Sequence, residues 1–124
     1  MRKAVSDSYL NHYWRKAVLA AWQYRCGLCW QNNQSLECHH VIRRCRVLTR
    51  WDWRNGIPLC PQCHQLAHTE KGRVLIAERS PYYHELVERE QENYKDVLAA
   101  RGITDAEFRR GKLAELKKVV ADAL

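Results

Sequence analysis

The sequence has no long uninterrupted hydrophobic run. No apolar stretch in the 124 residues is long enough for a membrane-spanning helix, so no membrane partner is expected. The start, MRKAVSDSYL, has no uninterrupted apolar h-region and no convincing cleavage site, which argues against export and favours a cytoplasmic protein. Repeats and low-complexity segments are also missing. The length predicts one domain, residues 1–79, with an appendage, residues 80–124.

Acidic residues are scarce in the first two thirds of the chain. Residues 1–80 carry 13 Lys and Arg against 5 Asp and Glu, a net charge of +8, whereas residues 81–124 carry 8 against 9, a net charge of −1. All six cysteines lie in the basic part. A positive surface beside metal ligands suits a polyanion, and nucleic acid is the obvious one. The alternative is a generally basic protein whose charges only face solvent.

Four cysteines form two CxxC pairs, Cys26 with Cys29 and Cys60 with Cys63, separated by 30 residues. Two such pairs are the usual ligands of a closed, tetrahedral, structural zinc site. Disulfide or redox chemistry is the alternative, but the absence of an export signal favours zinc. Gly27 is expected to allow the tight turn that aims the first two sulfurs at one ion.

Two cysteines remain outside these pairs. Cys38 precedes the histidine pair on an expected strand, so we interpret it as a small buried residue that points away from His39. Cys45 is expected in a loop without a role. A ligand set that includes either of them is the alternative. Glu37 shares the side of His39 and is a candidate partner for an imidazole or an arginine.

Hydrophobic periodicity and turn residues predict a short α+β finger with flanking helices. The amphipathic first helix begins at Ser6 or Asp7 and is expected to bury a stripe of Leu10, Trp14, Val18 and Trp22. A second helix follows Pro61, and Gly72 is a candidate interruption of it. The expected elements are a helix at 6–25, a turn at 31–34, strands at 35–42 and 57–59, a loop at 43–54 and a helix at 61–79. A zinc knuckle at Cys26 to Cys29, a hairpin and a helix in this order are typical of a treble-clef finger.

Two more helices are expected after residue 80. Ser80 and Pro81 predict the cap and first position of a helix over 81–100, which Gly102 ends. Thr104 and Glu107 form a capping box that opens a helix over 104–123. Together they predict a C-terminal helical hairpin that packs either on the finger or on a second copy of the chain, as a homodimer.

Four of the six histidines lie on the expected strand at 35–42 and the expected helix at 61–79. His39 and His40 are neighbours on a strand, so their side chains point to opposite faces and can do different work. His64 and His68 are four residues apart on an expected helix and share one face. A site of His39, His64 and His68 leaves positions open for water and phosphate, as a catalytic divalent ion requires.

The order His39-His40, Asn55, then His64 and His68 resembles the HNH endonucleases, also called His-Me finger or ββα-metal nucleases. It is closest to the form with paired histidines and an HxxxH helix found in DNase colicins, and the CxxC pairs resemble zinc-stapled HNH proteins of phages. The segment RWDWRNGIPLCPQCHQLAH is more loosely similar to phage NinG-like recombination proteins. The resemblance covers roughly residues 22–70, and it implies a bacterial host cell with a phage or prophage origin.

The resemblance implies a role for each matching residue. His40 would be the general base that activates water, and Asn55 would hold the loop that aims it. His39, His64 and His68 would bind the catalytic ion, which is Mg²⁺ or another divalent metal such as Mn²⁺, Ni²⁺ or Zn²⁺. The implied reaction is hydrolysis of phosphodiester bonds in duplex or branched DNA, with 5′-phosphate and 3′-hydroxyl products.

Arginines and tryptophans are the expected DNA contacts. Phosphates are the expected partners of five arginines between the histidine groups: Arg43, Arg44, Arg46, Arg50 and Arg54. Trp51 and Trp53 either stack on unpaired bases or anchor the loop to the core. The cysteines and arginines also fit a noncatalytic zinc finger that binds nucleic acid. The histidines distinguish the two functions, because a binding module does not need them.

Overall fold

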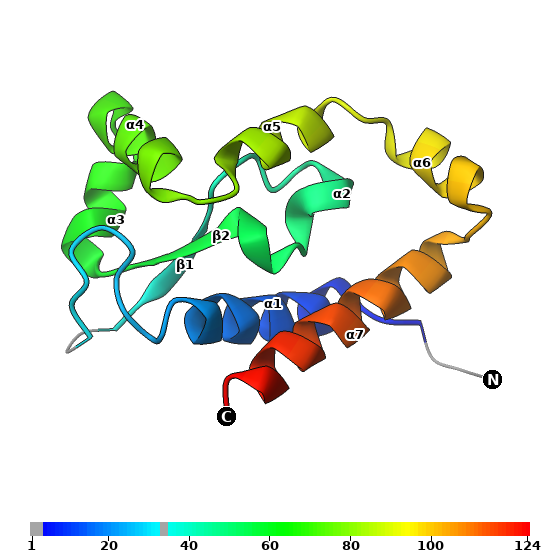
Figure 1. Cartoon of the computed structure of the whole chain (residues 1–124), viewed down its shortest axis with the longest axis horizontal. Helices are drawn as coiled ribbons and strands as arrows, with labels where there is room; N and C mark the ends of the chain where they lie inside the picture. Colours follow the sequence, from blue (N-terminus) through cyan, green and yellow to red (C-terminus); the bar gives the residue numbers. More distant parts are fainter. Residues whose placement is uncertain (1–3, 33–34) are drawn as a thin grey trace.

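The computed structural model describes residues 4–32 and 35–124, so the turn expected at 31–34 lies partly outside the described residues. Helices surround one small sheet (Figure 1). The elements are α1 (Asp7–Ala21), β1 (Glu37–His40), α2 (Val47–Arg50), the 3-10 helix η1 (Trp53–Asn55), β2 (Gly56–Leu59), α3 (Pro61–Ala67), α4 (Glu70–Arg79), α5 (Tyr83–Glu90), α6 (Tyr94–Arg101) and α7 (Asp105–Asp122). At this level the expected α+β class is confirmed. Among the described residues, no helix has the length and apolar character that crossing a membrane requires.

The sheet is an antiparallel pair of β1 and β2 that places the two adjacent histidines. His39 is opposite Ile57 and His40 is opposite Gly56. Because successive residues of a strand alternate between faces, the two imidazoles leave the sheet on different sides. The two rings therefore contact different neighbours, Trp14 for His40 and His64 for His39, although both residues line one cleft.

Helix α1 supports the sheet from one side. The Ser6 hydroxyl accepts a hydrogen bond from the Tyr9 N–H and caps the helix. Leu10, Trp14 and Val18 of the expected stripe are buried, whereas Trp22 follows the end of the helix and is half-buried. The helix ends at Ala21, four residues before the expected end at 25. Gln23 and Tyr24 have φ values of 58°, a left-handed conformation that stops the helix and turns the chain toward the first cysteine pair.

The segment 61–79 is not one helix. Helix α3 ends at Ala67, and the Thr69 hydroxyl accepts a hydrogen bond from the Gly72 N–H as the cap of α4. The interruption therefore comes at His68 and Thr69 rather than at Gly72. Gly72 lies inside α4, where a Cβ would fall 1.8 Å from the Leu66 carbonyl oxygen. Without a side chain there, α4 can pass directly over the end of α3.

The expected loop at 43–54 contains two short helices, α2 and η1. Both were missed because each is a single turn with no apolar period of its own. Leu48 and Thr49 of α2 are buried, and the Asp52 carboxylate accepts the Arg54 N–H at the start of η1. The segment therefore has an ordered path between the strands.

The expected single helix over 81–100 is wrong, although the segment after residue 80 does pack on the finger, one of the two expected arrangements. Residues 81–100 form α5 and α6, because Asn93 caps a new helix through the Asp96 N–H. Ser80 ends α4 rather than starting a helix, and α5 begins after Tyr82. Only α7 begins as expected, at the Thr104 capping box, and it ends at Asp122.

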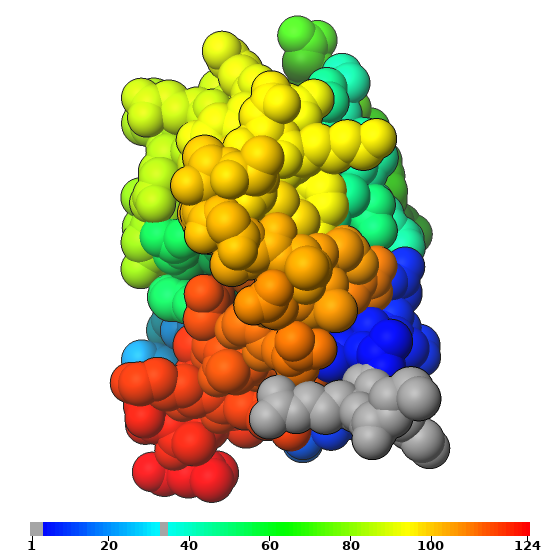
Figure 2. Space-filling model, turned by 90° about the vertical axis from the view of Figure 1, so that its right-hand side faces the viewer, coloured from blue at the N-terminus to red at the C-terminus, as the bar shows by residue number. Residues whose placement is uncertain are grey.

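Helix α7 packs along α1, while its first residues contact the preceding helix α6 through Phe108. Leu116 is buried in one cluster with Leu10 and Trp14 of α1 and with Trp51. Figure 2 shows α7 beside the first residues of α1 at one end of the molecule. Burial of a leucine side chain contributes about 1.5–3 kcal/mol, so this contact holds α7 on the finger. The core thus includes residues from both sides of the expected boundary at residue 79.

Candidate active site and metal centre

The four cysteines of the CxxC pairs meet at one point. Their sulfur atoms lie within 4.8 Å of one another, and the Sγ atoms of Cys29 and Cys60 are 3.7 Å apart. A tetrahedral zinc ion with Zn–S bonds of about 2.3 Å holds its sulfurs about 3.8 Å apart, so the donor set fits this ion. All six cysteines are free thiols, which excludes the disulfide alternative in this structure.

Backbone N–H groups around the four-cysteine cluster favour the thiolate form of Cys26. Burial raises the pKa of Cys26, but N–H groups of Cys29, Cys60 and Leu28 stabilise the thiolate and lower the pKa to about 6. The thiolate is the form that binds metal. Gly27 does not have the positive φ that its expected role in the turn implied. A Cβ there would lie 2.3 Å from the Ile57 side chain, so the glycine allows the knuckle to pack on β2.

His39 faces helix α3 and lies among the other two expected metal ligands. Its ring centroid is 5.8 Å from that of His64 and 5.9 Å from that of His68, and the last two are 5.1 Å apart. Burial and the charges of His64 and His68 lower the pKa of His39. It is therefore neutral at pH 7, the form in which an imidazole binds metal.

The three imidazoles are less tightly gathered than the cysteines. Among residues 4–32 and 35–124, the four cysteines form the one group of three or more ligands whose donor atoms all lie within 4.8 Å. His64 is half-buried and His68, which ends α3, is exposed. The donor chemistry fits a divalent ion, and the open side leaves room for water and phosphate.

His40 lies on the other face of the sheet and is held on two sides. Its ring is parallel to the Trp14 indole, with centroids 4.0 Å apart and planes 6° apart. Its Nε2 atom is 2.9 Å from the Arg50 carbonyl oxygen. Because a carbonyl can only accept, Nε2 carries the proton and Nδ1 keeps its lone pair. Burial lowers the pKa of His40 to about 4, so the ring is neutral at pH 7.

Asn55 is fully buried and ties together the segment between the strands. Its Oδ1 atom accepts the Ile42 N–H at 2.8 Å, and its Nδ2 group donates to the Thr49 carbonyl at 3.0 Å. These bonds close the arginine-bearing loop at its base. Thr49 is next to Arg50, whose carbonyl contacts His40, so Asn55 and His40 are bonded to neighbouring residues of the same loop.

A cleft of about 580 Å³ opens beside the histidines. His39, His40 and His68 line it, as do Arg43 and Arg44. A smaller groove of about 240 Å³ shares Cys38, His40 and Arg44 with it and continues toward α1. The exposed Glu37 lies in the smaller groove. Burial raises the pKa of Cys38 to about 12, so this thiol stays protonated.

The other three expected DNA-binding arginines have protein partners. Arg54 pairs with Asp52 and Glu85 at 2.9 Å each. Arg50 donates to the carbonyls of Arg44 and Cys45, and Arg46 lies 3.9 Å from Glu90. Of the five arginines that were expected to contact DNA, the structure therefore places two, Arg43 and Arg44, in the lining of the cleft.

Asp52 is the centre of a buried ion network that anchors η1. Its side chain is 2% exposed and accepts hydrogen bonds from Arg54 and from Arg89 of α5. Burial raises the pKa of Asp52, but hydrogen bonds from Arg54 outweigh it, and the pKa lies below its ordinary value. Asp52 therefore stabilises the fold as a carboxylate above about pH 4, and this contribution is lost as the pH falls through the folded-state pKa.

Replacing Asp52 with asparagine should lower the free energy of unfolding at pH 7 by about 2 kcal/mol, since both arginine partners are partly exposed. Urea unfolding at pH 7 and at pH 3 measures the effect. The difference from wild type should shrink at pH 3, because below about pH 4 the carboxyl of the unfolded chain is protonated and the advantage of the folded carboxylate is progressively lost. Asp122→Asn, which removes an exposed carboxylate paired with Lys118, is the matched control. A difference that does not change with pH would contradict this assignment.

Three residues of this region were not predicted. Trp14 was expected only as core, yet it also stacks on His40. Arg73 of α4 and Tyr83 of α5 line the cleft. The break falls at His68 and Thr69 rather than at Gly72 and sets the direction of α4, and Tyr83 follows on α5, so no local signal could place these two side chains.

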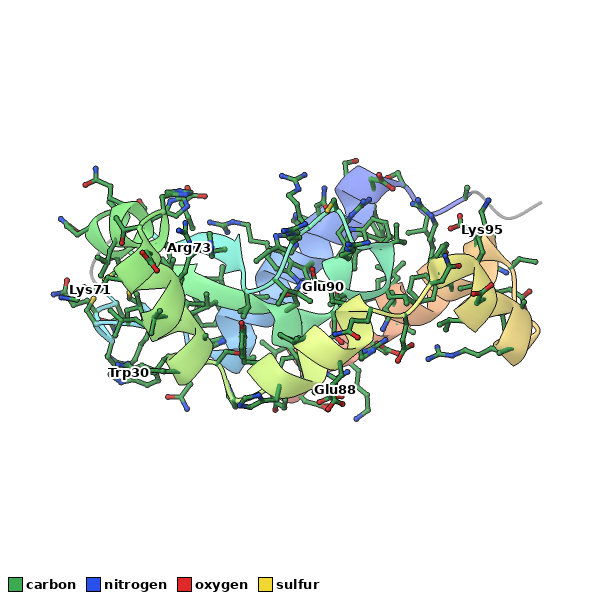
Figure 3. The ribbon with its side chains drawn as sticks, turned by 90° about the horizontal axis from the view of Figure 1, so that it is seen from above. Trp30, Lys71, Arg73, Glu88, Glu90 and Lys95 are labelled. Atoms are coloured by element: carbon green, nitrogen blue, oxygen red, sulfur yellow. The ribbon has the colours of Figure 1, made fainter. Side chains whose placement is uncertain are left out.

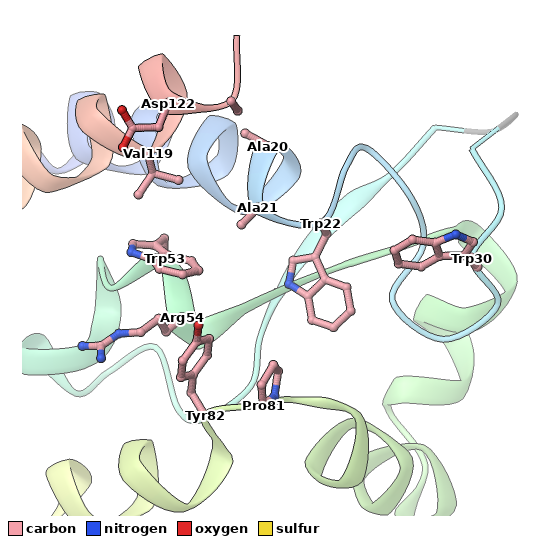
Figure 4. Close-up of a pocket in the computed structure, with 11 residues that line it drawn as sticks. Ala20, Ala21, Trp22, Trp30, Trp53, Arg54, Pro81, Tyr82, Val119 and Asp122 are labelled. Atoms are coloured by element: carbon pink, nitrogen blue, oxygen red, sulfur yellow. The ribbon is translucent and has the colours of Figure 1, made fainter.

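Trp51 and Trp53 have different surroundings. Trp51 is 1% exposed and its indole N–H donates to Asn11, so it anchors the core. Trp53 lines a separate aromatic pocket of about 550 Å³, with Trp22, Trp30 and Tyr82 (Figure 4). No histidine lines that pocket.

The central segment of the chain matches a known protein family. Residues 26–70 match the family described as HNH endonuclease. This segment contains both CxxC pairs, the four histidines of the site and Asn55, so the resemblance of this segment to the HNH endonucleases is confirmed. No curated protein and no solved structure matches the chain.

Proposed function

We propose that this protein is a metal-dependent endonuclease that hydrolyses phosphodiester bonds in DNA. One observation carries the proposal: His40, whose ring is held through Nε2 so that Nδ1 keeps its lone pair, lines the same cleft as His39 and His68. The family match of residues 26–70 supports nuclease activity or nucleic-acid binding. The basic balance of residues 1–80 supports a polyanionic substrate.

In the proposed reaction, His40 Nδ1 takes a proton from water as its oxygen forms a bond to phosphorus. The bond from phosphorus to the 3′ oxygen breaks, which leaves a 5′-phosphate and, after protonation, a 3′-hydroxyl. A divalent ion held by His39, His64 and His68 would supply Lewis-acid stabilisation of the phosphate and the leaving oxygen. Arg43 and Arg44 bind the backbone beside the cut. Asn55 keeps the loop closed, and the cysteine cluster holds a structural zinc ion.

The noncatalytic zinc-finger module is the second candidate. It is favoured by the looser grouping of the imidazole nitrogens compared with the cysteine sulfurs. A binding module needs the cysteines and the arginines, but it needs no neutral His40 with a fixed tautomer. The two candidates therefore differ in the chemistry of the cleft rather than in affinity for DNA.

Cleavage of supercoiled plasmid tests the proposal. Dialysis against EDTA should stop cleavage while the cysteine site keeps its zinc, and addition of Mg²⁺, Mn²⁺, Ni²⁺ or Zn²⁺ in turn should identify the ion that restores it. His68→Ala should weaken the response to that ion, whereas His84→Ala, an exposed histidine outside the cleft, should not. Tight DNA binding without cutting under any ion would contradict the nuclease and favour the binding module.

A further inference from the structure

One side of the cleft is made by helices outside the segment that matches the HNH family. Arg73 of α4 and Tyr83 of α5 face the cleft, and both follow residue 70. The Thr69 cap and the close passage of Gly72 over Leu66 set the position of α4. Figure 3 shows Arg73 toward the end of the molecule opposite Lys95. This side of the cleft is therefore built from residues that the family match does not include.

The floor of the cleft is apolar. Its nonpolar lining is Val41, Ile42, Ala67, Ile76 and the half-buried Tyr83. This floor adjoins His39 and His68, so it lies next to the place where a phosphate would be cut. A phosphate group alone gains nothing from an apolar floor, whereas the flat face of a nucleobase gains from stacking on a tyrosine ring.

The rim of the cleft is basic and unpaired. No carboxylate side chain lines the cleft, and among the described residues no ion pair involves Arg43, Arg44 or Arg73. Arg73 donates only to the His68 carbonyl, at 3.3 Å. This differs from Arg46, Arg50 and Arg54, each of which has an acidic side chain within 4 Å. Three free cations above an apolar floor match a phosphate backbone with an exposed base.

We propose that the substrate is DNA with an unpaired nucleotide beside the scissile phosphate, whose base stacks on Tyr83 while Arg44 and Arg73 bind the flanking phosphates. In an intact duplex each base is paired and stacked on its neighbours, so it cannot enter the floor of the cleft. In a gap or a single strand the base is free to do so. This inference rests on the proposed function, since it names the substrate class of the same site.

Binding in EDTA tests the substrate class without cleavage. Fluorescence anisotropy compares a labelled duplex with the same duplex carrying a short single-stranded gap. Wild type should bind the gapped DNA roughly tenfold more tightly, the scale of one base stacked on an aromatic ring. Tyr83→Ala should remove this preference and Tyr83→Phe should keep it. Tyr9→Ala, an exposed tyrosine on α1, is the control.

Replacing Arg73 should change DNA binding in a different way from replacing Tyr83. Arg73→Ala should weaken binding of both DNA forms and reduce the slope of log affinity against log salt by about 1, because a phosphate contact reads no base. In cleavage assays it should raise KM more than it lowers kcat. An unchanged salt slope would remove Arg73 from the proposed contact.

The outcomes separate the two proposals. Equal binding of gapped and intact duplex by wild type, or a preference that survives in Tyr83→Ala, would overturn the substrate class even if plasmid is cut. A gap preference that depends on Tyr83, without cleavage under any divalent ion, would support the stacking site and overturn the nuclease. Thermal unfolding of each variant shows whether a loss comes from the contact or from the fold.

Discussion

Replacement of His40 with alanine should abolish DNA cleavage and leave the zinc content and the fold intact. A general base contributes about 10²- to 10⁴-fold to a rate, so the remaining activity should lie near background. The expectation follows from the position of the ring: Nε2 is 2.9 Å from the Arg50 carbonyl, and Nδ1 is therefore free to accept a proton from water.

The neutral state of His40 makes this expectation firm at ordinary pH. Burial lowers its pKa to about 4, so nearly every molecule has an unprotonated Nδ1 at pH 7. The stacked Trp14 ring also limits rotation of the imidazole, which keeps Nδ1 aimed in one direction. The His40→Ala variant loses the proton acceptor and also the stacking contact with Trp14, so its melting temperature should fall slightly.

Two control histidines separate the base from a general effect of losing an imidazole. His12 and His84 are exposed and lie outside the cleft lining, so His12→Ala and His84→Ala should cut plasmid as wild type does. Single-turnover cleavage, zinc content and DNA affinity are measured for each variant. Cleavage by His40→Ala within a few-fold of wild type, with normal DNA affinity, would show that another group accepts the proton.

Local patterns in the sequence predicted the parts of the site that depend on spacing. The two CxxC pairs indicated one four-sulfur cluster, and the structure brings those sulfurs together. Strand alternation indicated that His39 and His40 point to different faces, and they contact α3 and Trp14 respectively. The capping box at Thr104 predicted the start of α7. In each case the residues within a few positions determine the local conformation.

Contacts between distant residues were not predictable in the same way. The arginines of residues 43–54 look equivalent in sequence, yet Arg54 is held by Asp52 and Glu85 while Arg44 lines the cleft. The difference depends on where α5 packs, which no local pattern records. The apolar stripe of α7 likewise fits a hairpin partner or α1 equally well, and only the shape of the Trp14 and Trp51 surface decides between them.

Replacement of Cys60 with serine should remove the structural zinc and unfold the finger. Cys60 is 2% exposed, precedes α3 and has its Sγ 3.7 Å from that of Cys29. Zinc-finger peptides gain about 10–16 kcal/mol from such an ion, as much as the whole stability of a typical small domain. We expect a melting temperature lower by more than about 10 °C and less than one zinc ion per chain.

The exposed Cys45 provides the matched control. Cys45→Ser removes a thiol outside the cluster and should keep one zinc ion per chain with an unchanged melting temperature. Metal analysis by mass spectrometry and thermal unfolding are measured on both variants. A full zinc content in Cys60→Ser, together with wild-type stability, would show that the four sulfurs do not hold the finger.

Loss of the cluster should also stop cleavage, although it changes none of the histidines. The cluster fixes the start of α3, which carries His64, and the buried core around it includes Ala67 and Ile76. Without zinc, α3 is no longer held against β2, and the group of His39, His64 and His68 disperses. Cys60→Ser should therefore lose zinc, stability and cleavage together, whereas His40→Ala should lose cleavage alone. This contrast assigns the cysteine cluster to the fold and the histidine cleft to the chemistry.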